Sequence, residues 1–255
     1  MQTAALESLG LAGEWSYEAI EMPPADFAEL TAALPGEGFV GANVTIPHKE
    51  AALALAHVAS VAANEIGAAN TLSFDGGEIR ADNTDAPGLL AALPEPPSGR
   101  AALILGAGGS ARAAAWALAG QGARVEVWNR TAARASELAE SLAGSAAVAA
   151  VAAVGADAAR SARYELIVNC TAVGMDSSDD PFTELPLERE ALGEGVTVID
   201  LVYAGGETAL LGTAREAGAT IVDGLEVLVR QGAESLRIWT GLEPPLDVMR
   251  QAARA

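Results

Sequence analysis

The sequence predicts an α/β fold of two domains, one of them built on a parallel, doubly wound sheet. After residue 100, short apolar segments alternate with helical segments, as parallel strands joined by helical crossovers do. Before that point, Asp75-Gly76-Gly77 lies between two strand-like segments and predicts a hairpin. The proline-rich stretch 94–99 divides the two patterns and is the best candidate for a domain boundary.

The first part of the chain contains short elements of both kinds. A helix ends at Gly10, and the alternation of residues 15–22 predicts a strand that Pro23 and Pro24 end. Strands are further expected over residues 39–46, 69–74 and 78–82, and helices over 26–34, 49–63 and 84–93.

The second part of the chain repeats strand and helix. The predicted strands span residues 101–105, 124–128, 166–169, 197–201 and 220–222. The predicted helices span residues 110–120, 132–142 and 225–237, with one more after Pro244 and Pro245. The alanine-rich residues 143–160 could contain a further short strand and helix.

Composition excludes several classes of protein. The 255 residues, 51% of them hydrophobic, are enough for one large packed domain or two ordinary ones. A net charge of −19 disfavours nucleic acid and anionic membranes as partners, although solubility or adaptation to salt would also account for it. The sequence has one cysteine, Cys170, and no apolar stretch long enough to span a membrane, so we expect a cytoplasmic protein without an intrachain disulfide.

A glycine-rich turn follows the first strand of the second part. The residues are Gly106, Ala107, Gly108, Gly109, Ser110 and Ala111. Glycines let the backbone approach a pyrophosphate, and the following helix offers free N–H groups and the positive end of its dipole. Because a second strand ends some twenty residues later, this context favours dinucleotide binding over a mere tight turn.

The tip of that second strand indicates which dinucleotide. Sites for NAD usually place an acidic residue there, but this chain has Asn129, Arg130 and Thr131, followed by Arg134. Guanidinium groups suit a 2′-phosphate, so the sequence favours NADP. An exposed basic pair at the start of a helix is the alternative.

Lys49 is the only lysine in the chain, which otherwise uses arginine for its cations. An amine can exchange protons near neutral pH and a guanidinium cannot, so Lys49 is a candidate acid or base, although an arginine-biased composition could also leave one lysine. It ends the polar stretch Asn43-Val44-Thr45-Ile46-Pro47-His48-Lys49 at the end of a predicted strand. A second polar group, Asn83-Thr84-Asp85, starts a helix, where Asp85 alone would usually be a cap.

Taken together with Gly67-Ala68-Ala69-Asn70-Thr71, which lies between them, these stretches closely resemble the substrate-domain motifs of shikimate dehydrogenases. The resemblance continues in order through the glycine turn and four further motifs, Asn129-Arg130-Thr131, residues 169–175, Asp200-Leu201-Val202-Tyr203 and Gln231-Gly232-Ala233. It covers residues 1 to about 250.

The resemblance implies an NADP-dependent oxidoreductase that reversibly reduces 3-dehydroshikimate to shikimate in chorismate and aromatic amino-acid biosynthesis. Residues 1–97 would form the substrate-binding domain, joined by C-terminal helices over 224–255, and residues 98–223 a Rossmann-like NADP-binding domain. Lys49 and Asp85 would be the catalytic pair.

The resemblance also implies the binding residues. The substrate would contact Thr45, Asn70, Asp85, Tyr203 and Gln231. The cofactor would contact Gly106, Ala107, Gly108, Gly109, Ser110, Ala111, Asn129, Arg130, Thr131, Arg134, Thr171, Met175 and Gly224. A small-molecule substrate is the expected partner, and a homodimer is compatible with the resemblance.

No metal is expected. His48, His57 and Cys170 lack the spacing of zinc ligands. We expect His48 to be structural, His57 to lie on a helix surface and Cys170 to act as a small hydrophobic residue.

The chain departs from the family pattern at its start. The family normally places a strand and a Ser-x-Ser turn, which binds the substrate carboxylate, before the helix ending Leu-Gly-Leu, here Leu9-Gly10-Leu11. Either Met1 is an internal methionine of a longer protein, which we expect, or the substrate site is damaged. Quinate or aminoshikimate dehydrogenase activity and non-catalytic NADP binding are the alternative functions.

Overall fold

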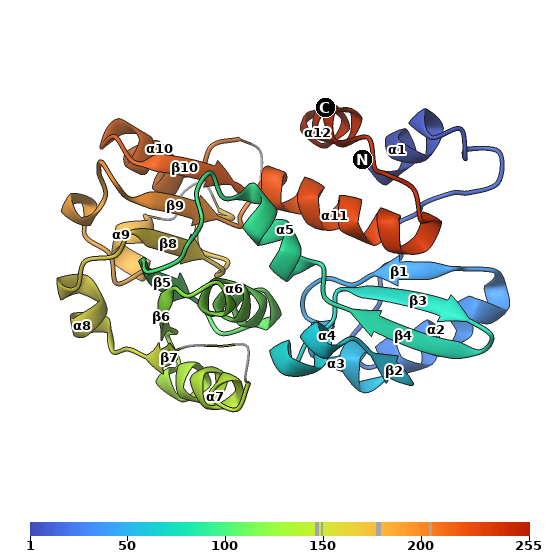
Figure 1. Cartoon of the computed structure of the whole chain (residues 1–255), viewed down its shortest axis with the longest axis horizontal. Coiled ribbons are helices and arrows are strands. Elements are labelled where there is room, and N and C mark those ends of the chain that lie inside the picture. Colours follow the sequence, from blue (N-terminus) through green and yellow to red (C-terminus); the bar gives the residue numbers. More distant parts are fainter. Residues whose placement is uncertain (146–147, 149, 177–179, 204–205) are drawn as a thin grey trace. The chain divides into compact units, whose positions relative to one another are not determined.

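Two compact units make up the chain in a computed structural model that describes residues 1–145, 148, 150–176, 180–203 and 206–255 (Figure 1). The first unit comprises Met1–Gly88 and Leu228–Ala255, and the second comprises Leu89–Val227. The proline-rich stretch 94–99 therefore lies inside the second unit. None of the described helices is long and apolar enough to cross a membrane.

The second unit is built on a six-stranded parallel sheet. Its strands are β5 (Ala101–Leu105), β6 (Arg124–Trp128), β7 (Ala150–Ala153), β8 (Leu166–Asn169), β9 (Thr197–Asp200) and β10 (Thr220–Asp223). They lie in the order β10-β9-β8-β5-β6-β7, so the chain adds strands to one side of β5 and then to the other. This is a doubly wound sheet, which confirms the predicted fold class.

Both faces of this sheet are covered by helices (Figure 1). Along β5, Ala102 and Ile104 face one core while Leu103 and Leu105 face the other, as the two-residue period of a strand requires. The first core contains residues of α5 (Asp85–Ala92), α6 (Gly109–Gly120) and α7 (Ala132–Leu142), and the second those of α8 (Ala156–Ser161), α10 (Ala209–Glu216) and the segment around α9 (Pro181–Glu184) and η2 (Arg189–Ala191).

The alanine-rich residues 143–160 do contain a strand and a helix, β7 and α8. Residues 146, 147 and 149 of this stretch lie outside the described part of the chain.

The first unit contains a smaller, mixed sheet. Its strands are β1 (Gly41–Asn43), β2 (Val58–Ala59), β3 (Thr71–Asp75) and β4 (Glu78–Asp82), in the order β1-β3-β4-β2. The predicted hairpin joins β3 to β4. Gly76 and Gly77 have φ values of 57° and 87°, the left-handed conformation that both central residues of a tight hairpin turn adopt.

Helices cover this sheet as well. On one face lie α2 (Phe27–Ala33), η1 (Leu34–Glu37), α3 (Lys49–Ala54) and α4 (Val61–Ile66), and on the other lies the part of α11 (Gly224–Thr240) that belongs to this unit (Figure 1). A separate apolar cluster joins α11 to α1 (Gln2–Ser8) and α12 (Leu246–Arg254). The sheet is therefore held between two helical layers, and α11 forms the layer next to the polar cluster described below.

Two predicted elements are wrong. Residues 15–22 form no strand, because side chains rather than a strand ladder attach them: Tyr17 donates to Asn43 at 3.1 Å and the carbonyl of Met22 bonds to His48 at 2.8 Å. The helix predicted over 49–63 is broken, because residues 58–59 pair with β4 and Ser60 caps a new helix by accepting the N–H of Ala63 at 3.2 Å.

Gly41 allows α11 to approach the sheet. The indole N–H of Trp239 passes beside Gly41 and donates to the carbonyl of Leu72 at 2.9 Å. A Cβ atom at Gly41 would lie 2.5 Å from that carbonyl oxygen and would also overlap the indole ring. The sequence accordingly uses a residue without a side chain at this position.

Replacement of Gly41 by alanine should destabilise the first unit by about 1–3 kcal/mol, because α11 must move away and the indole loses its acceptor. Urea unfolding followed by tryptophan fluorescence would measure the change. Gly36→Ala is the matched control, since nothing lies within 4 Å of a Cβ there and its φ is not positive. Equal stabilities of the two variants would contradict this account of Gly41.

Candidate active site

An ion pair joins two residues that the sequence places 36 positions apart. Lys49 is the first residue of α3 and Asp85 the first residue of α5, and Lys49 Nζ lies 2.6 Å from Asp85 Oδ2. Only 11% of the lysine side chain and 15% of the aspartate side chain are exposed. The ion pair is therefore shielded from water. The attraction between its two charges is much stronger in such a site than on the surface.

The Asp85 carboxylate is not the cap of its helix. Asn83 caps the helix instead, since its Oδ1 accepts the N–H of Ala86 at 3.2 Å while its amide donates to the carbonyl of Ala68 at 2.9 Å. Asp85 is left to accept from Lys49 through Oδ2 and from Asn70 through Oδ1, at 2.9 Å. The carboxylate thus orients both an amine and an amide.

Asn70 links this ion pair to α11. Its Nδ2 lies 2.9 Å from Asp85 Oδ1, 2.9 Å from Thr84 Oγ1 and 3.0 Å from Gln231 Oε1. An amide nitrogen carries only two hydrogens for these three acceptors. One of the acceptors can therefore bond to another partner while Nδ2 keeps its hydrogen bonds. Its Oδ1 accepts the N–H of Thr84 at 2.7 Å, which fixes the direction of the amide.

Hydroxyl groups complete the cluster. Ser235, one helical turn after Gln231, is fully buried and lies 2.8 Å from Thr71 Oγ1, 3.1 Å from Thr84 Oγ1 and 2.8 Å from Asn43 Nδ2. These bonds connect α11 to the end of β1, to the start of β3 and to the residue directly before α5. The structure therefore brings together Lys49, Asp85, Asn70 and Gln231, four of the residues that the sequence singled out.

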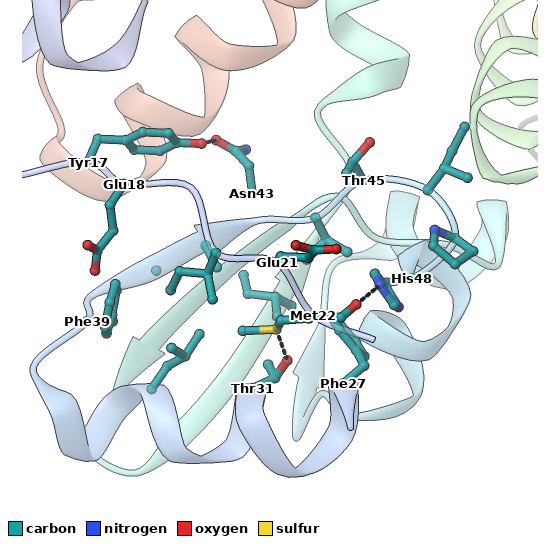
Figure 2. Close-up of a pocket in the computed structure, with 18 of the residues that line it drawn as sticks. Tyr17, Glu18, Glu21, Met22, Phe27, Thr31, Phe39, Asn43, Thr45 and His48 are labelled. Carbon is teal, nitrogen blue, oxygen red and sulfur yellow. Dashed lines mark hydrogen bonds between the residues drawn. The ribbon is translucent and has the colours of Figure 1, made fainter. Parts of the chain in front are cut away.

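Thr45 lies at the edge of a separate groove (Figure 2). This groove has a volume of about 340 Å³ and runs between the segment 16–24 and the segment 39–48. Apolar side chains such as Met22, Phe27 and Phe39 line it, and Tyr17 and His48 bridge it through their hydrogen bonds. The Thr45 side chain is exposed, so its hydroxyl can reach a ligand from solvent.

In the second unit, the glycine turn follows β5 as predicted. Gly106 has a φ of 112°, and a Cβ there would lie 3.1 Å from the carbonyl oxygen of Cys170. Gly108 is extended and caps α6, and nothing lies within 4 Å of a Cβ built on it. The turn thus leaves open space in front of a helix N-terminus, which fits the pyrophosphate of a dinucleotide. Ala111 is fully buried in the core beneath the turn.

The tip of β6 is polar and open. Arg130, Thr131 and Arg134 are exposed at the start of α7, and Asn129 donates from its amide to the carbonyl of Thr131 at 3.0 Å. The two guanidinium groups are therefore available to an anionic group, as a 2′-phosphate requires.

The other predicted residues of this unit lie after β8, after β9 and at the start of α11. Met175 is 63% exposed and Tyr203 is 50% exposed. Thr171 donates to Asn169 Oδ1 through its backbone N–H at 3.1 Å and through its hydroxyl at 2.7 Å. Gly224 packs against the backbone, since a Cβ there would lie 2.8 Å from the carbonyl oxygen of Leu201.

The histidines have structural contacts. His48 stacks on Phe27, with ring centroids 4.3 Å apart. His57 is exposed, but it lies in a bend and not on a helix as expected, because its Nδ1 accepts the N–H of Ile79. Among the described residues, no group of three histidine, cysteine, aspartate or glutamate side chains could hold a metal ion.

Some residues of these clusters were not selected from the sequence. Ser235 follows Gln231 by four residues on one helix face, a spacing that could have suggested contact between their surroundings. Asp200 ends the buried strand β9, and a charged residue that ends an apolar strand is itself a signal. Burial raises the pKa of Asp200 above its usual value, against the opposing hydrogen bonds from Thr208, Val202 and Asn169.

Comparison with known proteins shows the family of this chain. Family models match for the shikimate dehydrogenase substrate-binding domain at residues 1–72, for shikimate/quinate 5-dehydrogenase at 92–174 and for the shikimate 5′-dehydrogenase C-terminal domain at 224–254. The shikimate dehydrogenase (NADP(+)) of Methanothermobacter thermautotrophicus is 42% identical over 261 residues, which cover 100% of this chain and 90% of that protein. That of Geobacter metallireducens is 40% identical over 264 residues, with the same two coverages.

Solved structures give the same result. Shikimate 5-dehydrogenase from Thermus thermophilus, in complex with NADP(H) and shikimate, is 42% identical, with a TM-score of 0.86 over 99% of this chain and 92% of that one. Shikimate dehydrogenase from Aquifex aeolicus is 33% identical, with a TM-score of 0.88 over 100% of this chain and 91% of that one. The chain belongs to the shikimate dehydrogenase family.

Proposed function

We propose that this protein is an NADP-dependent shikimate dehydrogenase that interconverts 3-dehydroshikimate and shikimate in chorismate and aromatic amino-acid biosynthesis. The observation that carries the proposal is the shielded bond between the only lysine of the chain and Asp85, 2.6 Å long. Family membership and the names of the relatives support the reaction and its cofactor. Shikimate-dependent reduction of NADP⁺ by the purified protein, followed at the absorbance of NADPH, tests the proposal directly. Absence of such turnover would contradict it.

Lys49 handles the proton of this reaction. In the direction of reduction its ammonium group donates a proton to the ketone oxygen, and in the direction of oxidation its amine takes the proton of the hydroxyl group. Asp85 holds the lysine through Oδ2 and keeps the transferred charge paired. NADPH, when bound, supplies the hydride for reduction.

Uncharged side chains orient the substrate. The amides of Asn70 and Gln231 carry both donors and acceptors, which matches the hydroxyl groups of a polyhydroxylated ring. We assign the substrate contacts to Thr45, Asn70, Asp85, Tyr203 and Gln231. Of these, Asn70 already bonds to both Asp85 and Gln231 in this structure, so the three side chains form a preorganised surface.

The second unit would hold NADP. We assign the pyrophosphate to the glycine turn and the N-terminus of α6, and the 2′-phosphate to Arg130, Thr131 and Arg134, with Asn129 beside them. Thr171, Met175 and Gly224 would lie toward the nicotinamide. In a chain of net charge −19, the two exposed arginines supply the local positive charge that a phosphate requires.

The larger organisation follows from the same proposal. The first unit would bind the substrate and the second the cofactor, in keeping with the domain assignment made from the sequence. A cytoplasmic location and a homodimer are the remaining expectations.

Loss of the amine at Lys49 should abolish proton transfer. Lys49→Met should lower kcat by about 10²–10⁴-fold, and Lys49→Arg should lower it by a similar factor, because arginine keeps the charge but does not release a proton. NADPH binding, measured by fluorescence titration, should change less than about twofold. The neighbouring Glu50→Gln serves as the control. Activity of Lys49→Arg near that of wild type would show that only the charge matters.

The arginines should select the cofactor. Arg130→Ala combined with Arg134→Ala should raise the KM for NADPH about 10–100-fold, because charge-assisted bonds to the 2′-phosphate are lost. The KM for NADH should stay nearly constant. Arg160→Ala is the control, since Arg160 is an exposed arginine of the same unit that pairs with Glu188. An equal rise in KM for both cofactors would refute the assignment.

A further inference from the structure

The carboxylate of Asp200 is fully buried at the carboxyl end of β9, and the proposed proton transfer does not use it. Its Oδ2 accepts the hydroxyl of Thr208 at 2.6 Å. Its Oδ1 accepts the amide of Asn169 at 2.9 Å and the N–H of Val202 at 3.1 Å. Each donor belongs to a different segment, so one side chain ties together the ends of two adjacent strands and the start of a helix.

Through Asn169, the carboxylate controls the loop after β8. The amide of Asn169 donates both to Asp200 and to the carbonyl of Val173, at 3.1 Å, and its oxygen accepts the N–H and the hydroxyl of Thr171. With one donor on Asp200, the Asn169 amide can face only one way, and its oxygen is directed at Thr171. The bend of residues 170–173 therefore depends on a partner outside the loop.

That loop touches the glycine turn. A Cβ on Gly106 would lie 3.1 Å from the carbonyl oxygen of Cys170 and 3.4 Å from the Cγ2 atom of Thr171. A shift of the loop by even a few tenths of an ångström would thus alter the space beside the turn.

Asp200 also contacts the start of α10, the start of α11 and the backbone after β9. Its bond to Thr208 holds the N-cap of α10, because Thr208 also accepts the N–H of Leu211 at 3.3 Å. Its backbone packs against α11, since a Cβ on Gly224 would lie 2.9 Å from the carbonyl oxygen of Asp200. The bond to Val202 fixes the backbone directly before Tyr203.

We propose that Asp200 is a positioning residue, whose carboxylate sets residues 170–173 and 201–203, directly after β8 and β9, so that they receive the nicotinamide end of NADP(H). The adenosine end would instead depend on the glycine turn and on Arg130 and Arg134. This inference rests on the cofactor assignment of the proposed function. It predicts that the two halves of the cofactor respond differently to changes at Asp200.

The pKa of Asp200 supports a role beyond packing. Burial raises this pKa above its value in the unfolded chain, so the unfolded state binds fewer protons over that pH range and stability falls as pH rises through it. The stabilisation is complete only below the unfolded pKa. An uncharged residue of the same shape would avoid this loss of stability, so the carboxylate is held at a cost that its three hydrogen bonds offset only in part.

The test compares two probes. Adenosine 2′,5′-bisphosphate reports the adenosine half of the site, and NADPH reports the whole. For Asp200→Ala we expect the Kd of NADPH to rise about tenfold and that of the bisphosphate to change less than about twofold. Turnover should fall about 100-fold, since small misplacements at a reacting centre are costly.

Asp200→Asn keeps one acceptor oxygen and can donate to Thr208, so it should recover most of the NADPH affinity. Because burial raises the pKa of Asp200, this variant should also be at least as stable as wild type at pH 7.5. The difference in stability between the two proteins should be smaller at pH 4.5, and thermal melts at both pH values would measure it. Equal losses of affinity for both probes, or no loss for either, would overturn the proposal.

If Asp200→Ala does not fold, as judged by circular dichroism, Thr208→Val carries the test. It removes the bond to Oδ2, whereas Thr208→Ser keeps it. Thr213→Val is the matched control, because this threonine of the same helix bonds to the carbonyl of Ala209 and not to Asp200. Of these three threonine variants, only Thr208→Val should lose affinity for NADPH while keeping its affinity for the bisphosphate. If Thr208→Val shows no such selective loss, the role of Asp200 is refuted.

These binding measurements need no turnover. A wild-type protein that binds both probes but does not oxidise shikimate would refute the proposed reaction and leave the role of Asp200 open to the same comparison.

Discussion

The contact between Lys49 and Asp85 is the interaction on which the polar cluster of the first unit depends. Two charged groups that are less than one-sixth exposed stabilise a fold only when each satisfies the other, and loss of one partner from a buried pair typically costs about 3–5 kcal/mol. Asn70 donates to Asp85 and also bonds to Thr84 and Gln231, and Thr84 bonds in turn to Ser235. The hydrogen bonds that stabilise the buried charges also orient them, so the stability of the fold and the proposed chemistry depend on the same contacts.

Much of the fold could be predicted, because the central strands β5, β8 and β9 are short apolar segments buried almost throughout, and their boundaries follow from composition. The first unit was harder. Residues 15–22 alternate like a strand, but alternation cannot tell whether a neighbouring strand supplies the ladder, and here side chains hold the segment instead. The helix expected over 49–63 failed for the opposite reason: a two-residue pairing of residues 58–59 with β4 overrode local helix propensity.

The candidate site shows the same division. Lys49, Asp85, Asn70 and the glycine turn could be selected because their residue types carry chemistry or a backbone requirement. Ser235 and Asp200 gave weaker signals, a spacing on one helix face and a charge at the end of an apolar strand, because their partners Asn43 and Asn169 lie 192 and 31 positions away in the chain. The sequence thus indicated the candidate catalytic and binding residues, whereas the hydrogen bonds that position them were found only in the structure.

Chemical rescue of Lys49→Ala by small primary amines tests the role of this lysine most directly. If the side-chain amine transfers the proton, added amines should restore part of the shikimate-dependent turnover, and the logarithm of the rescued rate should vary linearly with the pKa of the amine. Glu50→Ala should show no response to the same amines. Undiminished activity of Lys49→Ala without amine, or a rescue that any salt reproduces, would contradict the account.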